Sequence, residues 1–149
     1  MKKYSKVPAP SDIRRPFVLT VGLQEGYSDE GTLHTLEEAI KIALSWMKKR
    51  ASSGKAFLTG AFAQAEVVYA WPEGTGQAGG GHEPVAEFHG EVSPLYAADL
   101  ADEEAKAMLD ELAVTLGRVL GQTRIYVAYR DEAWVLQAEE TATPTGETV

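Results

Sequence analysis

Arginine and aromatic side chains are the residues of this sequence best suited to bind a small ligand. An aromatic ring can stack on a nucleobase, and arginine can bind a phosphate through two parallel hydrogen bonds. Arg124 opens a predicted strand directly after a predicted helix, and ligand sites tend to lie at such element ends. For any one of these residues, a place in the core, in an interface or on the solvated surface is the competing interpretation. The side chains that we expect to bind a ligand are Arg124, Phe88, Tyr96, Arg118 and Tyr126.

The histidines and serines lack the spacing that metal binding or nucleophilic catalysis requires. His34, His82 and His89 form no pair three or four residues apart, and the sequence has no cysteine. No G-x-S-x-G motif is present. The glycines between residues 74 and 81 precede Pro84 and a predicted strand, whereas a phosphate-binding loop needs a helix N-terminus there. We therefore expect no catalytic residues, no metal and no cofactor, and a protein that is not an enzyme.

Length and composition predict one globular domain. The chain has 149 residues, of which 44% are hydrophobic, so it can bury a core without disulfides. Its net charge is −8 and its basic residues are scattered, which argues against binding to duplex nucleic acid. No apolar run is long enough for a membrane span, and no apolar run follows the charged N-terminus as in a secretory signal. A cytoplasmic location is the expectation.

The first predicted helix begins near Thr35. Thr35 and Glu38 match the capping box, in which each side chain satisfies a backbone N–H group at the helix start. Basic residues at 48–50 suit the C-terminal end of a helix, and Gly54 predicts its stop. The apolar stripe at helical spacing comprises Leu36, Ala39, Ile40, Ala43, Leu44 and Met47.

The second predicted helix carries the longer apolar stripe. Asp99 or Asp102 is expected to cap its start, and Gly121 to end it in the left-handed conformation. The stripe comprises Ala105, Met108, Leu109, Leu112, Ala113, Leu116, Val119 and Leu120.

Strands rich in β-branched and aromatic residues surround the two helices. A flexible arm (1–15), a long mobile loop (72–84) and a disordered tail (140–149) complete the chain, so that the domain spans 16–139. The order β-α-β-β-β-α-β-β predicts an α+β fold of two layers, a mostly antiparallel sheet with both helices on one face. The predicted strands are 17–23, 56–63, 66–71, 85–92, 124–129 and 133–138.

The second face of this sheet is also predicted to be apolar. Phe17, Leu19 and Val21 alternate with Val18, and the stretch around Tyr69 is apolar at successive positions. Two apolar faces need two covers, and two helices on one face supply only one. A second copy of the chain is a natural cover for the other face, so a homo-oligomer is expected.

Two segments resemble a known family. The stretch LTVGLQEGYSDEGTLHTLEEAI (19–40) resembles the first strand, loop and helix start of the phage anti-Thoeris sponge proteins, and LGQTRIYVAYRDEAWVLQAE (120–139) resembles their closing hairpin. The N-terminal arm and the glycine-rich segment depart from that family. The resemblance implies an oligomeric protein in the bacterial host that sequesters a cyclic ADP-ribose signal without cleaving it. A cyclic nucleotide is then the expected partner.

Two other functions remain open at this point. One is a small isomerase-like enzyme of α+β fold, although tautomerases use an N-terminal proline and this chain begins Met1-Lys2. The other is a protein-interaction module that acts through its sheet or its acidic surface.

Overall fold

The computed structural model describes residues 1–8, 13–26, 30–72 and 79–139. Two helices and five strands are formed within this part of the chain. In chain order they are β1 Pro16–Gly22, α1 Leu36–Ser52, β2 Ala61–Trp71, β3 Gly79–Glu91, α2 Asp102–Val119, β4 Arg124–Tyr129 and β5 Glu132–Gln137.

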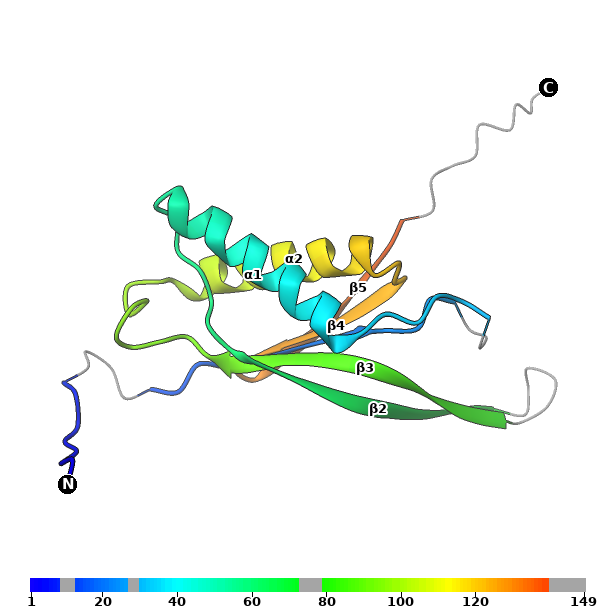
Figure 1. Ribbon diagram of the computed structural model, residues 1–149, viewed down its shortest axis with the longest axis horizontal. Coiled ribbons are helices and arrows are strands. Elements are labelled where there is room, and N and C mark those ends of the chain that lie inside the picture. The colour runs from blue at the N-terminus through cyan, green and yellow to red at the C-terminus, as the bar shows by residue number, and fades with distance from the viewer. Residues whose placement is uncertain (9–12, 27–29, 73–78, 140–149) are drawn as a thin grey trace.

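The five strands form one antiparallel sheet in the order β2-β3-β1-β4-β5. The first strand in the chain is therefore the central one, and it pairs with β3 on one side and β4 on the other. Both helices lie against the same face of the sheet, and the opposite face is left open (Figure 1). This arrangement confirms the predicted α+β fold of two layers, with a mostly antiparallel sheet under two helices.

The number of strands differs from the prediction because two expected strands form a single long one. Residues 61–71 run without interruption as β2, and residues 56–60 are outside the sheet. The predicted loop 72–84 is strand from Gly79 onward, and residues 73–78 lie outside the described part of the chain. Glycines usually weaken a strand, but here the ring of Trp71 lies over Gly79 and that of Tyr69 over Gly81, where no side chain would fit. The large rings thus cover the bare backbone opposite them.

Helix α1 begins and ends where the sequence predicts. Thr35 is the N-cap, and its hydroxyl oxygen accepts a hydrogen bond of 3.2 Å from the Glu38 backbone N–H. Gly54 follows the helix with φ +70°, a left-handed conformation that glycine adopts without strain. The apolar stripe is shifted, because Trp46 is buried and Leu44 is 46% exposed. The predicted place of Leu44 in the core is therefore wrong.

Helix α2 packs most of its predicted stripe into the core, but its start differs from the prediction. Ala101 is the N-cap and has no capping side chain, so neither Asp99 nor Asp102 caps the helix. The carboxylate of Asp102 instead binds groups outside the helix. Gly121 ends the helix with φ +64°, as predicted. Val119, expected in the stripe, is exposed.

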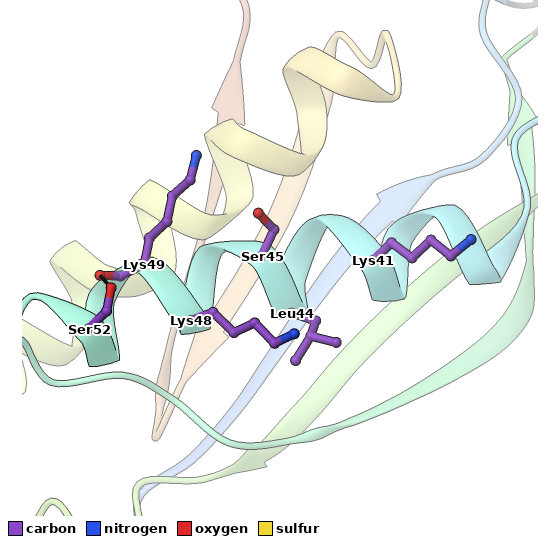
Figure 2. Close-up of a pocket in the computed structure, with 6 residues that line it drawn as sticks. All are labelled: Lys41, Leu44, Ser45, Lys48, Lys49 and Ser52. Carbon is purple, nitrogen blue, oxygen red and sulfur yellow. Dashed lines mark hydrogen bonds between the residues drawn. The ribbon is translucent and has the colours of Figure 1, made fainter.

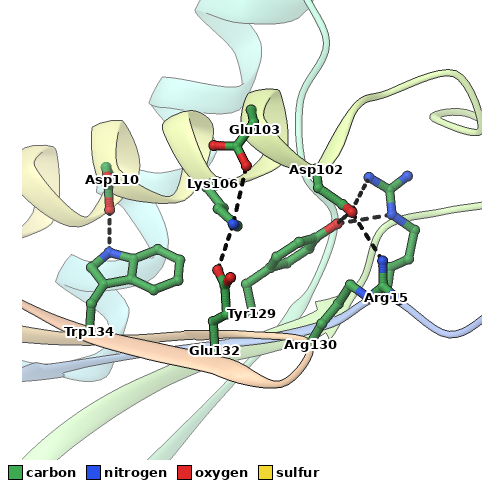
Figure 3. Close-up of polar contacts among 9 residues, drawn as sticks. All are labelled: Arg15, Asp102, Glu103, Lys106, Asp110, Tyr129, Arg130, Glu132 and Trp134. Carbon is green, nitrogen blue, oxygen red and sulfur yellow. Dashed lines mark hydrogen bonds and ion pairs between the residues drawn. The ribbon is translucent and has the colours of Figure 1, made fainter.

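A cluster of charged groups ties the segment before β1 to α2 and to the β4–β5 turn (Figure 3). The Asp102 carboxylate pairs with Arg15 at 3.0 Å and with Arg130 at 3.0 Å. The Tyr129 hydroxyl donates a hydrogen bond to Asp102 and accepts one of 2.9 Å from Arg15. Residues 1–8 of the predicted arm are exposed, and the predicted tail lies outside the described residues, so its disorder stays a prediction.

Asp102→Asn is expected to lower the melting temperature at pH 7 and to have much less effect in acid. The hydrogen bond from Tyr129 is the largest cause that lowers the pKa of Asp102, with Arg15 and Arg130 adding to it against a smaller effect of burial. A depressed carboxyl pKa contributes stability that is present above the ordinary value of 3.8 and is lost as the pH falls through the lower folded value. Thermal melts at several pH values measure the difference, with exposed Asp99→Asn as the matched control. Equal destabilisation by both variants would contradict this account.

The open face of the sheet carries large apolar side chains, and a second copy of the chain is expected to cover part of this face. Light scattering at micromolar concentration is expected to give a mass of two or more chains, since contiguous apolar patches of this kind mark contact surfaces. A mass of one chain at that concentration would contradict the expectation. The exposed side chains on this face are Val18, Val67, Tyr69, Trp71, Tyr126 and Val135.

Candidate active site

A hollow of about 550 Å³ lies on the open face of the sheet. Strands β1, β2, β3 and β4 form its floor, and the segments that follow β1 and α2 form its rim. Its lining combines carboxylates, a guanidinium, phenol rings and small apolar groups. The lining residues are Thr20, Gly22, Gly26, Val67, Tyr69, Glu83, Val85, Glu87, Gly121, Thr123, Arg124 and Tyr126.

Strand alternation decides which side chains reach this hollow. Glu83, Val85 and Glu87 on β3 stand two residues apart and therefore point to the same face. Ala86 and Phe88 occupy the alternate positions of the strand, point to the helices and are buried in the core. The β1 register extends this pattern across the sheet, with Glu87 opposite Thr20 and Thr20 opposite Tyr126.

Glu83 has an unusual environment for a carboxyl group at a surface. Partial burial raises its pKa, and the negative charge of Glu66 on β2 raises it further. A carboxylate in such surroundings is well suited to bind a cation, because a positive ligand offsets both the cost of burial and the repulsion by Glu66. Perturbed acidic groups of this kind are a common feature of active sites.

Arg124 and Tyr126 are the two predicted ligand-binding residues that the structure brings together. Both belong to β4, project from the same face and line the hollow. The Arg124 Nε donates a hydrogen bond of 3.3 Å to the Gln137 side-chain oxygen on β5. Tyr126 is 52% exposed and presents its ring on the open face.

The other three predicted residues lie elsewhere. Phe88 is 1% exposed and packs between Phe17 and Phe62, with ring centroids 5.5 and 4.8 Å away, so it belongs to the core on the opposite face. Tyr96 is 87% exposed in the loop before α2, beside a separate hollow of about 330 Å³. Arg118 is exposed in the last turn of α2, on the helix side of the sheet. None of the three lines the hollow on the open face.

Sequence reasoning missed Glu83 and Glu87. The sequence offers little signal for them, because the apolar residues Pro84, Val85 and Ala86 separate the two carboxylates and the stretch shows no regular alternation of polar and apolar residues. The expectation of a loop up to Pro84 concealed the first of the two carboxylates.

A shallower hollow of about 440 Å³ lies along the outer surface of α1 (Figure 2). Its lining comes from that single helix and includes Lys41, Lys48, Lys49 and the exposed Leu44. It holds no acidic group beside the lysines. A basic helix surface without a second wall is best interpreted as solvated, and we do not assign it a ligand.

Metal-binding clusters and membrane-spanning helices are absent from the described residues. Among them, no three His, Asp or Glu side chains are grouped so as to hold a metal ion. Neither α1 nor α2 has the length and apolar character needed to cross a membrane.

Two solved structures share this fold. Both are of phage SAM lyase, one in complex with S-methyl-5'-thioadenosine and one in the apo state. The first superposes with a TM-score of 0.65 at 14% identity, over 92% of this chain and 97% of the other. The second superposes with a TM-score of 0.66 at 18% identity, over 92% and 99%. No family model and no curated protein matches the sequence.

The shared fold bears on two expectations from the sequence. One is that the protein is not an enzyme, and the other is the resemblance to the anti-Thoeris sponge family. A protein that is not an enzyme was expected, and this is contradicted, because both structures with the fold are of an enzyme. The likeness to SAM lyase also gives no support to the anti-Thoeris sponge family. What the expected family and the two solved structures have in common is a phage origin and a small ligand that contains adenosine.

Proposed function

We propose that this protein is an enzyme that cleaves S-adenosylmethionine (SAM) at a carbon–sulfur bond without water and releases S-methyl-5'-thioadenosine. The observation that carries the proposal is an acidic, aromatic hollow on the open face of a fold shared with SAM lyase. The fold alone is a weak argument for chemistry, because one fold can serve many functions. The chemistry of the hollow is therefore the main support.

The charges of the hollow suit SAM. At neutral pH, SAM carries a sulfonium, an ammonium and one carboxylate, and so has a net charge of +1. Glu83 and Glu87 can face the two cationic groups, and Arg124 can pair with the carboxylate. Cyclic ADP-ribose carries an anionic pyrophosphate, which the two carboxylates would repel. The hollow thus favours a cationic nucleoside over the cyclic nucleotide suggested by the sequence resemblance.

The proposed reaction needs no nucleophile from the protein. One oxygen of the substrate's own carboxylate forms a bond to Cγ as the Cγ–S bond breaks, and the electron pair of that bond stays on sulfur. The products are neutral S-methyl-5'-thioadenosine and homoserine lactone, which has a five-membered ring. Together they contain all the atoms and electrons of the substrate. The protein must bind the substrate, bend its amino-acid part toward Cγ and exclude water.

Apolar surroundings would accelerate this step. The reaction removes one positive and one negative charge as they combine, so water, which stabilises the separated charges, opposes it. Val67 and Val85 give the hollow an apolar floor between the carboxylates. Tyr69 and Tyr126 present rings that can stack on adenine or lie against the sulfonium.

In a phage, such an enzyme would act inside the bacterial host. Consumption of SAM removes the methyl donor on which host methylation depends. We propose that the protein counters host defence in this way, in keeping with the phage origin of both structures with this fold.

Arg124→Ala is expected to raise the KM for SAM about tenfold and to leave the melting temperature nearly unchanged, since one charge-assisted contact to a carboxylate is lost. Arg124→Lys should restore only part of the affinity, because the two-pronged geometry of the guanidinium is lost. Steady-state kinetics beside a thermal melt measure both quantities. If the variant is less stable and its KM is unchanged, then Arg124 serves the β4–β5 hairpin through Gln137 and not the ligand.

Incubation with SAM or with cyclic ADP-ribose, followed by denaturation and identification of the nucleotides, tests the proposal. We expect SAM to be converted and cyclic ADP-ribose to be neither retained nor changed. Recovery of intact, bound cyclic ADP-ribose would overturn the proposal in favour of sequestration. If neither compound is retained nor converted, the proposal is also wrong and an interaction module becomes the better account.

A further inference from the structure

Gln122 stands at the junction between α2 and β4, and its side-chain amide joins two separate segments. The Nε2 group donates hydrogen bonds of 3.0 Å to the backbone oxygen of Gln24 and of 3.0 Å to that of Leu120. The Gln122 backbone N–H donates a third bond, of 2.9 Å, to the Gly117 oxygen. The same nitrogen therefore binds both the residue that follows α2, Leu120, and the segment that follows β1, at Gln24.

The two joined segments form two adjoining walls at the rim of the hollow. Gly26 lines it on the loop side, and Gly121, Thr123 and Arg124 line it on the other. Between them, Gly22 forms the floor, and the Gln122 Oε1 occupies the space where a side chain at that position would begin. The Gln122 amide thus lies over Gly22 and between the two walls.

A second contact fixes the same rim. The Glu25 carboxylate lies over Gly121, close enough to exclude a side chain there, and its Oε2 is 2.8 Å from the His34 Nε2. His34 is also 2.6 Å from Glu38 in the first turn of α1. Glu25, which precedes Gly26, is therefore in contact with Gly121 after α2 and with His34 before α1.

We infer that Gln122 is a positioning residue, which sets the spacing between the two walls of the hollow and so the affinity for the substrate. This inference rests on the proposed function. The amide suits the role because both of its partners are carbonyl oxygens, which need an N–H donor. A leucine of similar size has no such donor, and Gln122 is not among the residues that line the hollow. Removal of the Gln122 amide should therefore raise KM more than it lowers kcat.

The test is a double-mutant cycle of Gln122→Ala and Gly22→Ala. Gln122→Ala removes the bridge, and Gly22→Ala displaces the same amide from below. We expect each single variant to raise the KM for SAM about tenfold, as the loss of two hydrogen bonds implies, with kcat within about twofold of the wild type. The double variant should be clearly less impaired than the product of the two single effects, because both act through one side chain.

Trp134→Phe is the matched control, because it removes a hydrogen bond of 2.7 Å to Asp110 on the opposite, helix side of the sheet. It should lower the melting temperature and leave KM unchanged. Calorimetry with S-methyl-5'-thioadenosine gives a second readout, in which the Gln122→Ala variant should bind about tenfold more weakly. If the wild type cleaves SAM and Gln122→Ala retains its KM, or if the two changes simply multiply, the inference is wrong. If the wild type does not cleave SAM, the proposed function fails first.

Discussion

Glu83→Gln is expected to lower kcat/KM for SAM by about tenfold to a hundredfold, because a charge-assisted contact to the cationic substrate is lost. The glutamine keeps the size of the side chain, so the shape of the hollow is preserved. Steady-state kinetics with SAM measure the loss. Glu66→Gln is the matched control, since Glu66 lies on the same hairpin, pairs with His82 and does not line the hollow. A similar loss in both variants would show that the effect is general electrostatics and not a contact in the site.

The same substitution should raise the stability of the free protein slightly at pH 7. Burial, and then the charge of Glu66, raise the pKa of Glu83, so the folded state holds this proton more tightly than the unfolded chain does. An ionised Glu83 therefore disfavours folding at neutral pH, and that cost disappears as the pH falls below the ordinary value of 4.5. The melting temperatures of variant and wild type should converge in acid. Lower activity together with higher stability is typical of a group placed for function.

Phe88→Ala is expected to destabilise the fold by about 3–5 kcal/mol, the usual cost of removing a fully buried phenylalanine. Its ring packs against Phe17 and Phe62, and Gly60 leaves room for it, because a side chain there would collide with the ring. Urea denaturation measures the change. Tyr96→Ala is the matched control, since it removes an exposed ring, and its effect should stay within about 0.5 kcal/mol.

Phe88 and Tyr96 were both predicted from the sequence to bind a ligand. The stabilities of the two alanine variants distinguish a ring in the core from a ring on the surface. If Phe88→Ala retains the stability of the wild type and loses only ligand binding, the placement of Phe88 in the core is wrong. Phe88→Leu should recover part of the lost stability, because it fills part of the cavity.

The helices could be predicted from the sequence because their signals are local. Thr35 as a cap, and Gly54 and Gly121 as left-handed stops, act within one turn of the chain. The N-cap of α2 could not be predicted, because Asp102 binds Arg15 and Arg130, which are remote in sequence. The strand at Gly79–Gly81 depends in the same way on rings from the neighbouring strand.

The candidate site could be predicted only in part. Arg124 and Tyr126 lie in a strand that the sequence predicts, and both line the hollow. Glu83 and Glu87 join them only through the order β3-β1-β4, in which strands distant in the sequence become neighbours. The expectation of an anionic cyclic nucleotide came from the family resemblance, and the arginines were considered without these carboxylates.

The central claim is tested most directly by the products formed from SAM in water enriched in ¹⁸O. The protein is incubated with SAM, and the products are identified by mass spectrometry at early times. We predict equal amounts of S-methyl-5'-thioadenosine and homoserine lactone, with no ¹⁸O in the lactone, because the ring oxygen comes from the substrate's carboxylate. Intact SAM, or homoserine that carries ¹⁸O from its first appearance, would contradict the account.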